Sequence, residues 1–372
     1  MLRKFSVSNF KNFENAVELD LTNVKEYDFN KFAIKNQTVN NAIIYGRNGV
    51  GKSNLALGIF DIILHLTDKE RTDHFYKNYL NANSNSPVAT FYYEFLINSQ
   101  RVVYEYKKAN YKTILYERFS INGNDLAVLD RRTGFEAKIL FKGAETLKTT
   151  IENPNLSLLK YIKNNSVLES DETNTTFFDF FTFIDKMLYF RSLHDNIYQG
   201  LDIGNTDILE DIIKKDNVED FEFFLNTAGI ECKLAVIKTM NKNMIVFDFM
   251  NGSMIPFHEI ASTGTIALAL FYYWFQSVKE NSKVSFLFID EFDAFYHHRL
   301  SSLIVEKLKE TGVQFLLTTH NTSIMTNDLL RPDCYFLMTR KQIRSFADST
   351  PKELREAHNI EKMYKAGLFY GE

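Results

Sequence analysis

The sequence lacks the features that mark disulfide-stabilised, metal-stapled and membrane-spanning proteins. Its 372 residues contain two cysteines, Cys232 and Cys334, which form no C-x-x-C pair, so neither a disulfide framework nor a zinc site is indicated. No stretch approaches the roughly 18 uninterrupted apolar residues of a membrane-spanning helix, and the N-terminus has no apolar signal-peptide core. We therefore expect a cytoplasmic protein without a membrane anchor.

Flexible linkers, internal repeats and a strong net charge are also missing. Hydrophobic residues make up 45% of the chain and charged residues 24%, which is typical of a globular protein rather than a disordered one. With no proline-rich or glycine/serine linker, we expect one contiguous body. The net charge of -4 gives no general attraction to nucleic acid, so a DNA partner is left open but is not indicated.

One motif stands out in this background. Residues 46–53 read G-R-N-G-V-G-K-S, a full match to the phosphate-binding loop G-x-x-x-x-G-K-[ST]. Its glycines let the backbone N–H groups curl around phosphates, Lys52 adds a positive charge, and the Ser53 hydroxyl is a magnesium ligand. The predicted nucleotide-binding residues here are Asn48, Gly49, Gly51, Lys52, Ser53 and Asn54. An apolar run at 41–45 predicts a buried strand before the loop, and helical periodicity over 54–66 predicts a helix after it.

Two further regions alternate between apolar and polar residues, as strands do. Residues 5–10 and 16–21 predict an antiparallel pair, and residues 86–142 predict an antiparallel β lobe built as a meander. From 151 to 230 the pattern becomes helical, with amphipathic stretches at 156–162, 177–189 and 208–213. We therefore predict a main body formed by residues 1–150 and 231–372, with a helical insert at 151–230.

The predicted insert is strongly acidic. It contains fifteen Asp and Glu residues against six Lys and Arg residues, which argues against contact with a phosphate backbone. Its aromatic stretch at 177–189 predicts a docking surface for a partner protein. The alternative is that these helices only pack on one another.

A second chemical motif follows an apolar run at 284–289. Asp290 and Glu291 end this predicted strand, which is the Walker B arrangement that holds magnesium and activates a water. A further predicted strand at 313–317 is followed by His320. Because parallel strands share one carboxyl edge, we expect His320, Asp290 and the phosphate loop to converge there.

A third motif begins a predicted helix. Residues 262–265 read S-T-G-T and precede a helix-periodic stretch at 266–278. Free N–H groups and the positive end of the helix dipole suit a phosphate at Ser262 and Gly264. An ordinary helix cap has the same pattern, so this motif indicates a phosphate site only in combination with the phosphate loop and the Walker B motif.

Taken together, these motifs resemble an ABC-type ATPase head of the SMC, RecF and OLD group, which implies an α/β fold of the P-loop class with an antiparallel β lobe and a helical insert. The turn at 7–13, V-S-N-F-K-N-F, is similar to that group's N-terminal turn, and the C-terminal stretches at 346–348, 354–359 and 365–367 resemble stand-alone AAA-type ATPases of bacterial phage-defence and abortive-infection operons. The resemblance implies ATP and Mg²⁺ as cofactors. It also implies roles for individual residues: catalysis by Glu291 and His320, nucleotide contact by Lys11, and metal ligation by Ser53 and Asp290.

The sequence departs from related classes in informative ways. It lacks the L-S-G-G-Q of transporters, the closely spaced Walker motifs of AAA+ motors and the heptads of long SMC arms. No clear Q-loop glutamine is present, so residues 153–157 are the substitute we assign. Because only a short segment follows His320, we expect any nuclease to be a separate chain.

These features favour an ATP-binding and ATP-hydrolysing switch. Two heads of a homo-oligomer would share composite ATP sites, and their association would regulate a separate effector, such as a nuclease, in anti-phage defence. The alternative is a RecF- or SMC-like DNA-repair or DNA-clamp ATPase. A scaffold that binds ATP without hydrolysing it is disfavoured by Glu291.

Overall fold

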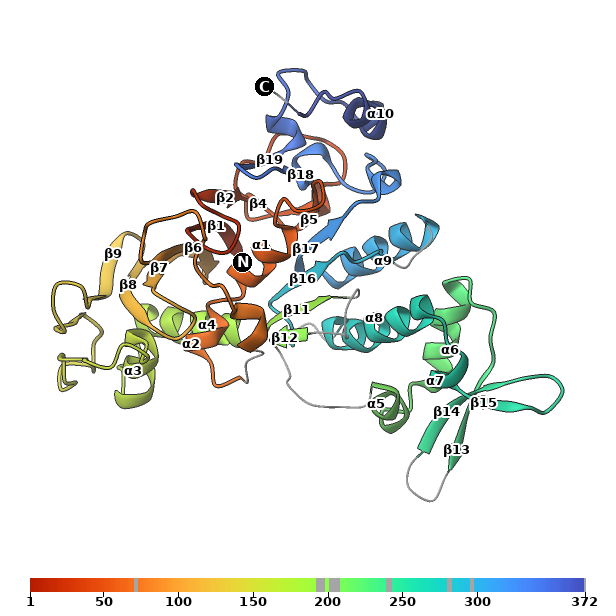
Figure 1. Ribbon diagram of the computed structural model, residues 1–372, viewed down its shortest axis with the longest axis horizontal. Helices are drawn as coiled ribbons and strands as arrows, with labels where there is room; N and C mark the ends of the chain where they lie inside the picture. The colour runs from red at the N-terminus through yellow and green to blue at the C-terminus, as the bar shows by residue number, and fades with distance from the viewer. Residues whose placement is uncertain are drawn as a thin grey trace.

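The computed structural model describes residues 1–69, 73–191, 198–200, 208–238, 243–279, 283–294 and 298–370. Figure 1 shows a β lobe beside a central sheet, with an outlying group of helices and a small sheet on the far side of the centre. The predicted α/β class with an antiparallel β lobe is confirmed.

The β lobe is a single antiparallel sheet in the order β10-β9-β8-β7-β6-β1-β2. Its strands are β1 (Leu2–Ser8), β2 (Val17–Asp20), β6 (Ala89–Ile97), β7 (Gln100–Lys108), β8 (Ile114–Ile121), β9 (Asn124–Asp130) and β10 (Lys138–Ile139). The predicted N-terminal pair and meander are both present. They join into one sheet because β1 pairs with β6 as well as with β2.

The central sheet has the order β12-β11-β16-β17-β5-β18-β19. Its inner strands run parallel: β11 (Met187–Arg191), β16 (Phe286–Asp290), β17 (Gln314–Thr319), β5 (Asn41–Tyr45) and β18 (Tyr335–Met338). Antiparallel β12 (Tyr198–Gly200) and β19 (Ile343–Ser345) lie at the two edges. Strands β5, β16, β17 and β18 are buried throughout, as expected for parallel strands covered on both faces.

The helix predicted after the phosphate loop is broken in two. Helix α1 (Lys52–Ile59) ends before Phe60, and α2 (Ile63–Leu66) begins three residues later. Asp61 lies in the break and is fully buried, where its carboxylate accepts hydrogen bonds from Tyr79, Tyr106 and Lys108. These bonds join the phosphate-loop helix to the β lobe, and periodicity within the helix gives no sign of them.

Residues 151–230 do not form one separate insert, so the predicted domain boundary is wrong here. Helices α3 (Leu158–Asn165) and α4 (Glu172–Asp185) pack against the β lobe, with the Phe180 ring 5.5 Å from that of Phe95. The predicted helix at 177–189 ends at Asp185, and the chain then enters the central sheet as β11 beside β16. The aromatic side chains Phe177, Phe180 and Phe181 are buried and cannot contact a partner protein, whereas Phe178 in the same stretch is exposed.

The outlying group follows β12 in the chain and lies away from the β lobe (Figure 1). It contains α5 (Ile208–Lys214), α6 (Val218–Thr227), β13 (Leu234–Lys238), β14 (Asn243–Asp248), β15 (Met254–Pro256) and α7 (Phe257–Ile260). Helix α8 (Thr263–Lys279) joins this group to the centre, because its Trp274 ring stacks on Phe190 of β11.

The remaining elements among the described residues are two short strands, two helices and five short turns. They are β3 (Ile34–Lys35), β4 (Thr38–Val39), α9 (His298–Thr311), α10 (Ile360–Lys365) and the short 3-10 turns Lys31–Ala33, Asp73–Tyr76, Thr322–Ile324, Pro332–Cys334 and Phe346–Asp348. In the part of the chain that the structure describes, no helix is both long enough and apolar enough to span a lipid bilayer.

Candidate nucleotide-phosphate site

The phosphate loop connects the carboxyl end of β5 to the start of α1 (Figure 1). Gly49 and Gly51 have φ values of 75° and 110°, a conformation that side chains with a Cβ rarely adopt. A Cβ on Gly46 would lie 2.7 Å from the carbonyl oxygen of Met338, and one on Gly51 would overlap the Asn12 side chain. The loop therefore requires glycine for its backbone conformation at 49 and 51, and for space beside the Met338 carbonyl at 46.

Lys52 lies at the centre of the site and is buried. Its Nζ donates to the Gly46 carbonyl at 3.0 Å and lies 2.8 Å from Nε2 of His320. Because an ammonium group can only donate, Nε2 must accept this bond, and His320 is then the neutral tautomer protonated at Nδ1. Desolvation lowers the pKa of Lys52, while the charges of Glu291 and Asp290 oppose that shift. The pKa of His320 is lowered by desolvation and then by the positive charge of Lys52.

Asp290 ends β16 and is fully buried. Its Oδ1 accepts a hydrogen bond of 2.7 Å from the Thr318 hydroxyl, which in turn accepts from the backbone N–H of Glu291 at 2.7 Å. Thr318 therefore connects the ends of the neighbouring parallel strands β16 and β17. Glu291 has φ of 48°, in the left-handed region that non-glycine residues seldom occupy, and the bond to Thr318 holds its backbone there.

A second link joins the turn after β16 to the residues after β17. The Thr319 hydroxyl donates to Asp293 at 2.6 Å and accepts from the backbone N–H of Asn321 at 2.8 Å. Burial raises the pKa of Asp293, and hydrogen bonds from Thr319, Asn321 and Ser301 oppose the rise. The turn that carries Glu291 and the segment that carries His320 are therefore held in one network.

Arg191, the last residue of β11, is opposite Asp290 in the parallel register. Its Nε lies 3.4 Å from Asp290 Oδ2 and its Nη2 lies 3.7 Å from Glu291 Oε2. Both distances are ion-pair distances, but Nε and Oδ2 make no hydrogen bond with each other or with another described group. The sequence prediction had placed Arg191 in the helical insert, so this contact was missed.

The residues at this edge fit a magnesium ion. Oδ2 of Asp290 is buried and accepts no hydrogen bond among the described residues, and Ser53 adds a hydroxyl at the start of α1. One carboxylate and one hydroxyl form a small oxygen donor set, which suits Mg²⁺ because that ion is usually completed by phosphate oxygens and water. Asp290 and Ser53 would hold the ion, which supplies positive charge to neutralise the phosphates.

Ser262 and Gly264 are not joined to this cluster by any described contact. The Ser262 hydroxyl caps its own helix by accepting from the backbone N–H of Thr265 at 3.2 Å, and its carbonyl accepts from Ile266. Ser262 and Thr263 are exposed and Gly264 is partly exposed. The start of α8 is therefore open to a ligand or to another chain.

Other predicted residues occupy different places. Lys11 Nζ donates to the carbonyls of Phe75 and Lys77, whereas its neighbour Asn12 donates to the Val50 carbonyl at 2.9 Å and accepts from Asn54. Asn12 thus supports the phosphate loop, although sequence reasoning did not select it. Asn48 is exposed beside Gly49.

The assigned Q-loop substitute, residues 153–157, is wrong. Ser157 donates to Glu117 of β8, and the carbonyl oxygen of Pro154 accepts from the backbone N–H of Ile114, so the segment lies against the β lobe. The strand that lies next to β16, and so reaches the edge where Asp290 lies, is β11. This strand ends at Arg191.

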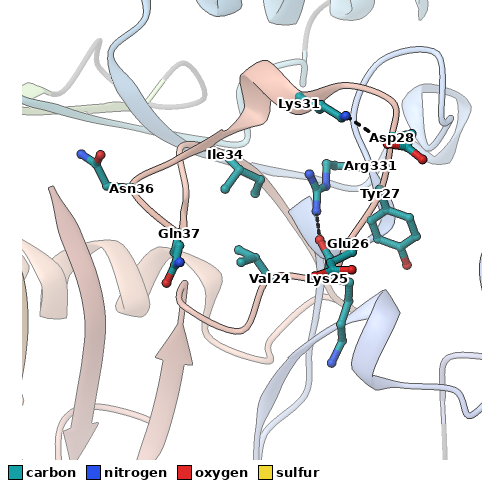
Figure 2. A pocket seen from close by; sticks show the side chains of 10 residues that line it. All are labelled: Val24, Lys25, Glu26, Tyr27, Asp28, Lys31, Ile34, Asn36, Gln37 and Arg331. Atoms are coloured by element: carbon teal, nitrogen blue, oxygen red, sulfur yellow. Dashed lines mark hydrogen bonds and ion pairs between the residues drawn. The ribbon is translucent and has the colours of Figure 1, made fainter.

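The structure also contains an open cavity of about 600 Å³ at the opposite, amino edge of the central sheet. Figure 2 shows the side chains that line it, which belong to Arg331, just before β18, and to part of the segment between Val24 and Gln37. Arg331 is paired with Asp333 at 2.8 Å and also donates to the Lys25 carbonyl. Its guanidinium therefore stabilises the residues that line the cavity. This cavity is separate from the carboxyl edge that carries Lys52 and Asp290.

Comparison with protein families gives a clear result. The chain belongs to the family described as "AAA domain, putative AbiEii toxin, Type IV TA system", whose model matches residues 42–326. The matched stretch runs from β5 past His320 and so includes every element of the phosphate-loop and Walker B cluster. The resemblance to stand-alone bacterial AAA-type ATPases is confirmed, and with it an ATPase-type, nucleotide-binding domain.

Solved structures show a looser similarity. An SMC head domain from Thermotoga maritima is 16% identical over 92% of this chain and 98% of its own, with a TM-score of 0.43. A Smc head domain derived from Pyrococcus furiosus, bound to the C-terminal domain of ScpA, is 14% identical over 98% of both chains, with a TM-score of 0.45. Scores this low do not establish a shared fold, so the assignment rests on the family model. Among curated proteins, none matches the sequence.

Proposed function

We propose that this protein binds and hydrolyses ATP at the carboxyl edge of its central sheet and uses the ATP-bound state as a switch. The observation that carries the proposal is the convergence of Lys52, His320 and Asp290 at the ends of the adjacent strands β5, β17 and β16. Lys52 would offset the negative charge of the phosphates, and the phosphate loop would bind their oxygens through its backbone N–H groups.

In this proposal, Asp290 and Ser53 hold Mg²⁺ and Glu291 takes a proton from the attacking water. The hydrogen bond from the Glu291 N–H to Thr318 fixes the backbone of Glu291. Once Lys52 turns toward the nucleotide, His320 would take the tautomer protonated at Nε2 and donate a hydrogen bond from Nε2 to the terminal phosphate. The carboxylate of Glu291, on a backbone fixed by the bond to Thr318, is a suitable general base.

The proposed ATP site is composite. The described contacts of Ser262 stay within its own helix start, yet its exposed N–H groups suit an anion. A second copy of the chain would bring this helix start to the phosphates bound by the first. ATP would thereby join two copies, and hydrolysis would release them.

We further propose that this association regulates a separate effector protein in abortive infection. Support comes from the family description, which names a putative toxin of a toxin–antitoxin system. The effector is proposed as a different chain, such as a nuclease.

The first test is ATP hydrolysis and ATP-dependent association of the purified full-length chain, measured by phosphate release and by light scattering. Absence of both ATP binding and hydrolysis would overturn the proposal. Co-expression with the product of the adjacent gene would show whether that partner's activity follows the ATP state. Hydrolysis that DNA stimulates, with a steep dependence on salt, would favour the DNA-clamp alternative instead.

A further inference from the structure

Two adjacent carboxylates, Asp290 and Glu291, face the single guanidinium of Arg191. The Asp290 side chain is fully buried, that of Glu291 is 21% exposed, and that of Arg191 is 25% exposed. Lys52 also lies near this pair, but its ammonium contacts Gly46 and His320. The guanidinium of Arg191 reaches both acids.

A buried carboxylate is costly unless a positive charge accompanies it. Arg191 supplies that charge, yet its Nε makes no hydrogen bond to Asp290 Oδ2 at 3.4 Å. A guanidinium committed to structure usually binds a carboxylate through two aligned hydrogen bonds, as Arg331 does with Asp333 at 2.8 Å for both nitrogens. The Arg191 contact thus compensates charge and leaves the Oδ2 lone pairs available.

We propose that Arg191 is a positioning residue that neutralises Asp290 and Glu291 when no divalent cation is bound, and gives way to that cation when it arrives with nucleotide. This inference rests on the proposed metal site at Asp290. It assigns a function to the end of β11, which the phosphate-loop and Walker B motifs do not include.

The proposal predicts effects of opposite sign for a cation and an anion. The positive charge of Arg191 opposes a divalent cation at Asp290 and attracts a triphosphate in the absence of metal. Removing that charge should therefore strengthen cation binding and weaken metal-free nucleotide binding. A residue with only a packing role would change both in the same direction, or neither.

The test uses full-length Arg191→Met, Arg191→Lys and, as a distant charge control, Arg344→Met on the exposed part of β19. Mn²⁺ binding to nucleotide-free protein is followed by electron paramagnetic resonance, and binding of a fluorescent ATP analogue is measured in EDTA. We expect Arg191→Met to bind Mn²⁺ roughly tenfold more tightly and the analogue several-fold more weakly. Arg191→Lys and Arg344→Met should both remain near wild type.

Asp290→Asn provides a second arm of the test. In that background, Arg191→Met should no longer change Mn²⁺ affinity, because the carboxylate that Arg191 guards is gone. An unchanged or weakened Mn²⁺ affinity in folded Arg191→Met would overturn the proposal, as would a gain that persists with Asp290→Asn. If wild type binds no ATP analogue even with Mg²⁺, the proposed ATPase function fails, but the Mn²⁺ results still decide the role of Arg191.

Discussion

The carboxyl edge of the central sheet and the start of α8 differ in how completely they are built. At the sheet edge, Lys52 and Asp290 are buried and are cross-linked to His320 and Thr318. At the start of α8, Ser262 is exposed and caps only its own helix. The side chains at the sheet edge are held in place by one another without a ligand. At the start of α8, by contrast, the first backbone N–H groups have no acceptor among the described contacts. This difference is what a site shared between two chains requires.

The largest expected effect is at the organised edge. Lys52→Ala removes the ammonium group that lies within the phosphate loop, against the Gly46 carbonyl. The loss of this positive charge should weaken ATP binding by about 3 kcal/mol, roughly a hundredfold. Fluorescence titration with an ATP analogue measures the loss. Lys11→Ala is the matched control, because its ammonium binds the carbonyls of Phe75 and Lys77 instead. Equal affinity in wild type and Lys52→Ala would show that this loop does not bind ATP.

Glu291→Gln should separate binding from hydrolysis. The amide keeps the size of the side chain but cannot accept the proton, so phosphate release should fall by a factor on the order of 10² to 10⁴ while ATP binding persists. The ATP-bound association should then accumulate, as measured by light scattering with ATP and Mg²⁺. Hydrolysis at the wild-type rate would exclude Glu291 as the general base.

Ser262→Arg tests the open region. The large charged side chain should leave ATP binding to one chain intact while blocking association and hydrolysis. Mixing Ser262→Arg with Lys52→Ala regenerates one site with an intact loop and an intact helix start, so hydrolysis should return in the mixture. Ser262→Ala, which loses only a cap worth about 1 kcal/mol, is the control. No recovery at concentrations where wild type associates would count against a shared site.

Thr318→Val should loosen the organised edge without removing a charge. It deletes the bond to Asp290 and the acceptor for the Glu291 N–H, which should cost about 1–3 kcal/mol in stability and reduce the hydrolysis rate. Thr38→Val is a matched control at the amino edge, where a buried hydroxyl donates to the Asn36 carbonyl. Thermal unfolding should shift in both variants, but hydrolysis should fall only in Thr318→Val.

The smallest effect concerns pH. Because the folded pKa of His320 lies below its unfolded value, the unfolded chain binds a proton first and stability falls as pH drops through the unfolded value toward the folded one. His320→Gln should show a shallower loss of stability over that acidic range, and urea unfolding at several pH values measures it. Parallel curves for the two proteins would mean that burial and the charge of Lys52 do not lower the pKa of His320 in the folded protein.

The sequence was sufficient where a motif and a local pattern agree. Residues 46–53 match a loop with demanding backbone geometry, and the short apolar runs before Gly46 and before Asp290 are strands that are buried on both faces. The meander from β6 to β9 was predictable because its strands follow one another directly both in the sequence and in the sheet. In these regions the local pattern and the tertiary fold require the same residues.

The sequence was insufficient where long-range pairing decides the structure. Residues 187–190 are apolar and continue the aromatic pattern of α4, and only their pairing with β16 makes them a strand. Arg191 was missed for the same reason. Asn12 contacts the phosphate loop across 38 positions of the chain, which no local pattern reports. The break at Asp61 likewise depends on Tyr79, Tyr106 and Lys108 from outside the helix.

The strand order of the central sheet has a consequence for how the chain folds during synthesis. Strand β5 is complete at Tyr45, but both of its neighbours, β17 and β18, begin after residue 313. The β lobe, by contrast, has all its strands by Ile139 and can form while the rest is being translated. The strand that precedes the phosphate loop can therefore pair with its neighbours only after most of the chain has been synthesised. Pairing of such high sequence separation is slow, so a nascent or truncated chain would expose the edges of β5 and would be a preferred target for chaperones.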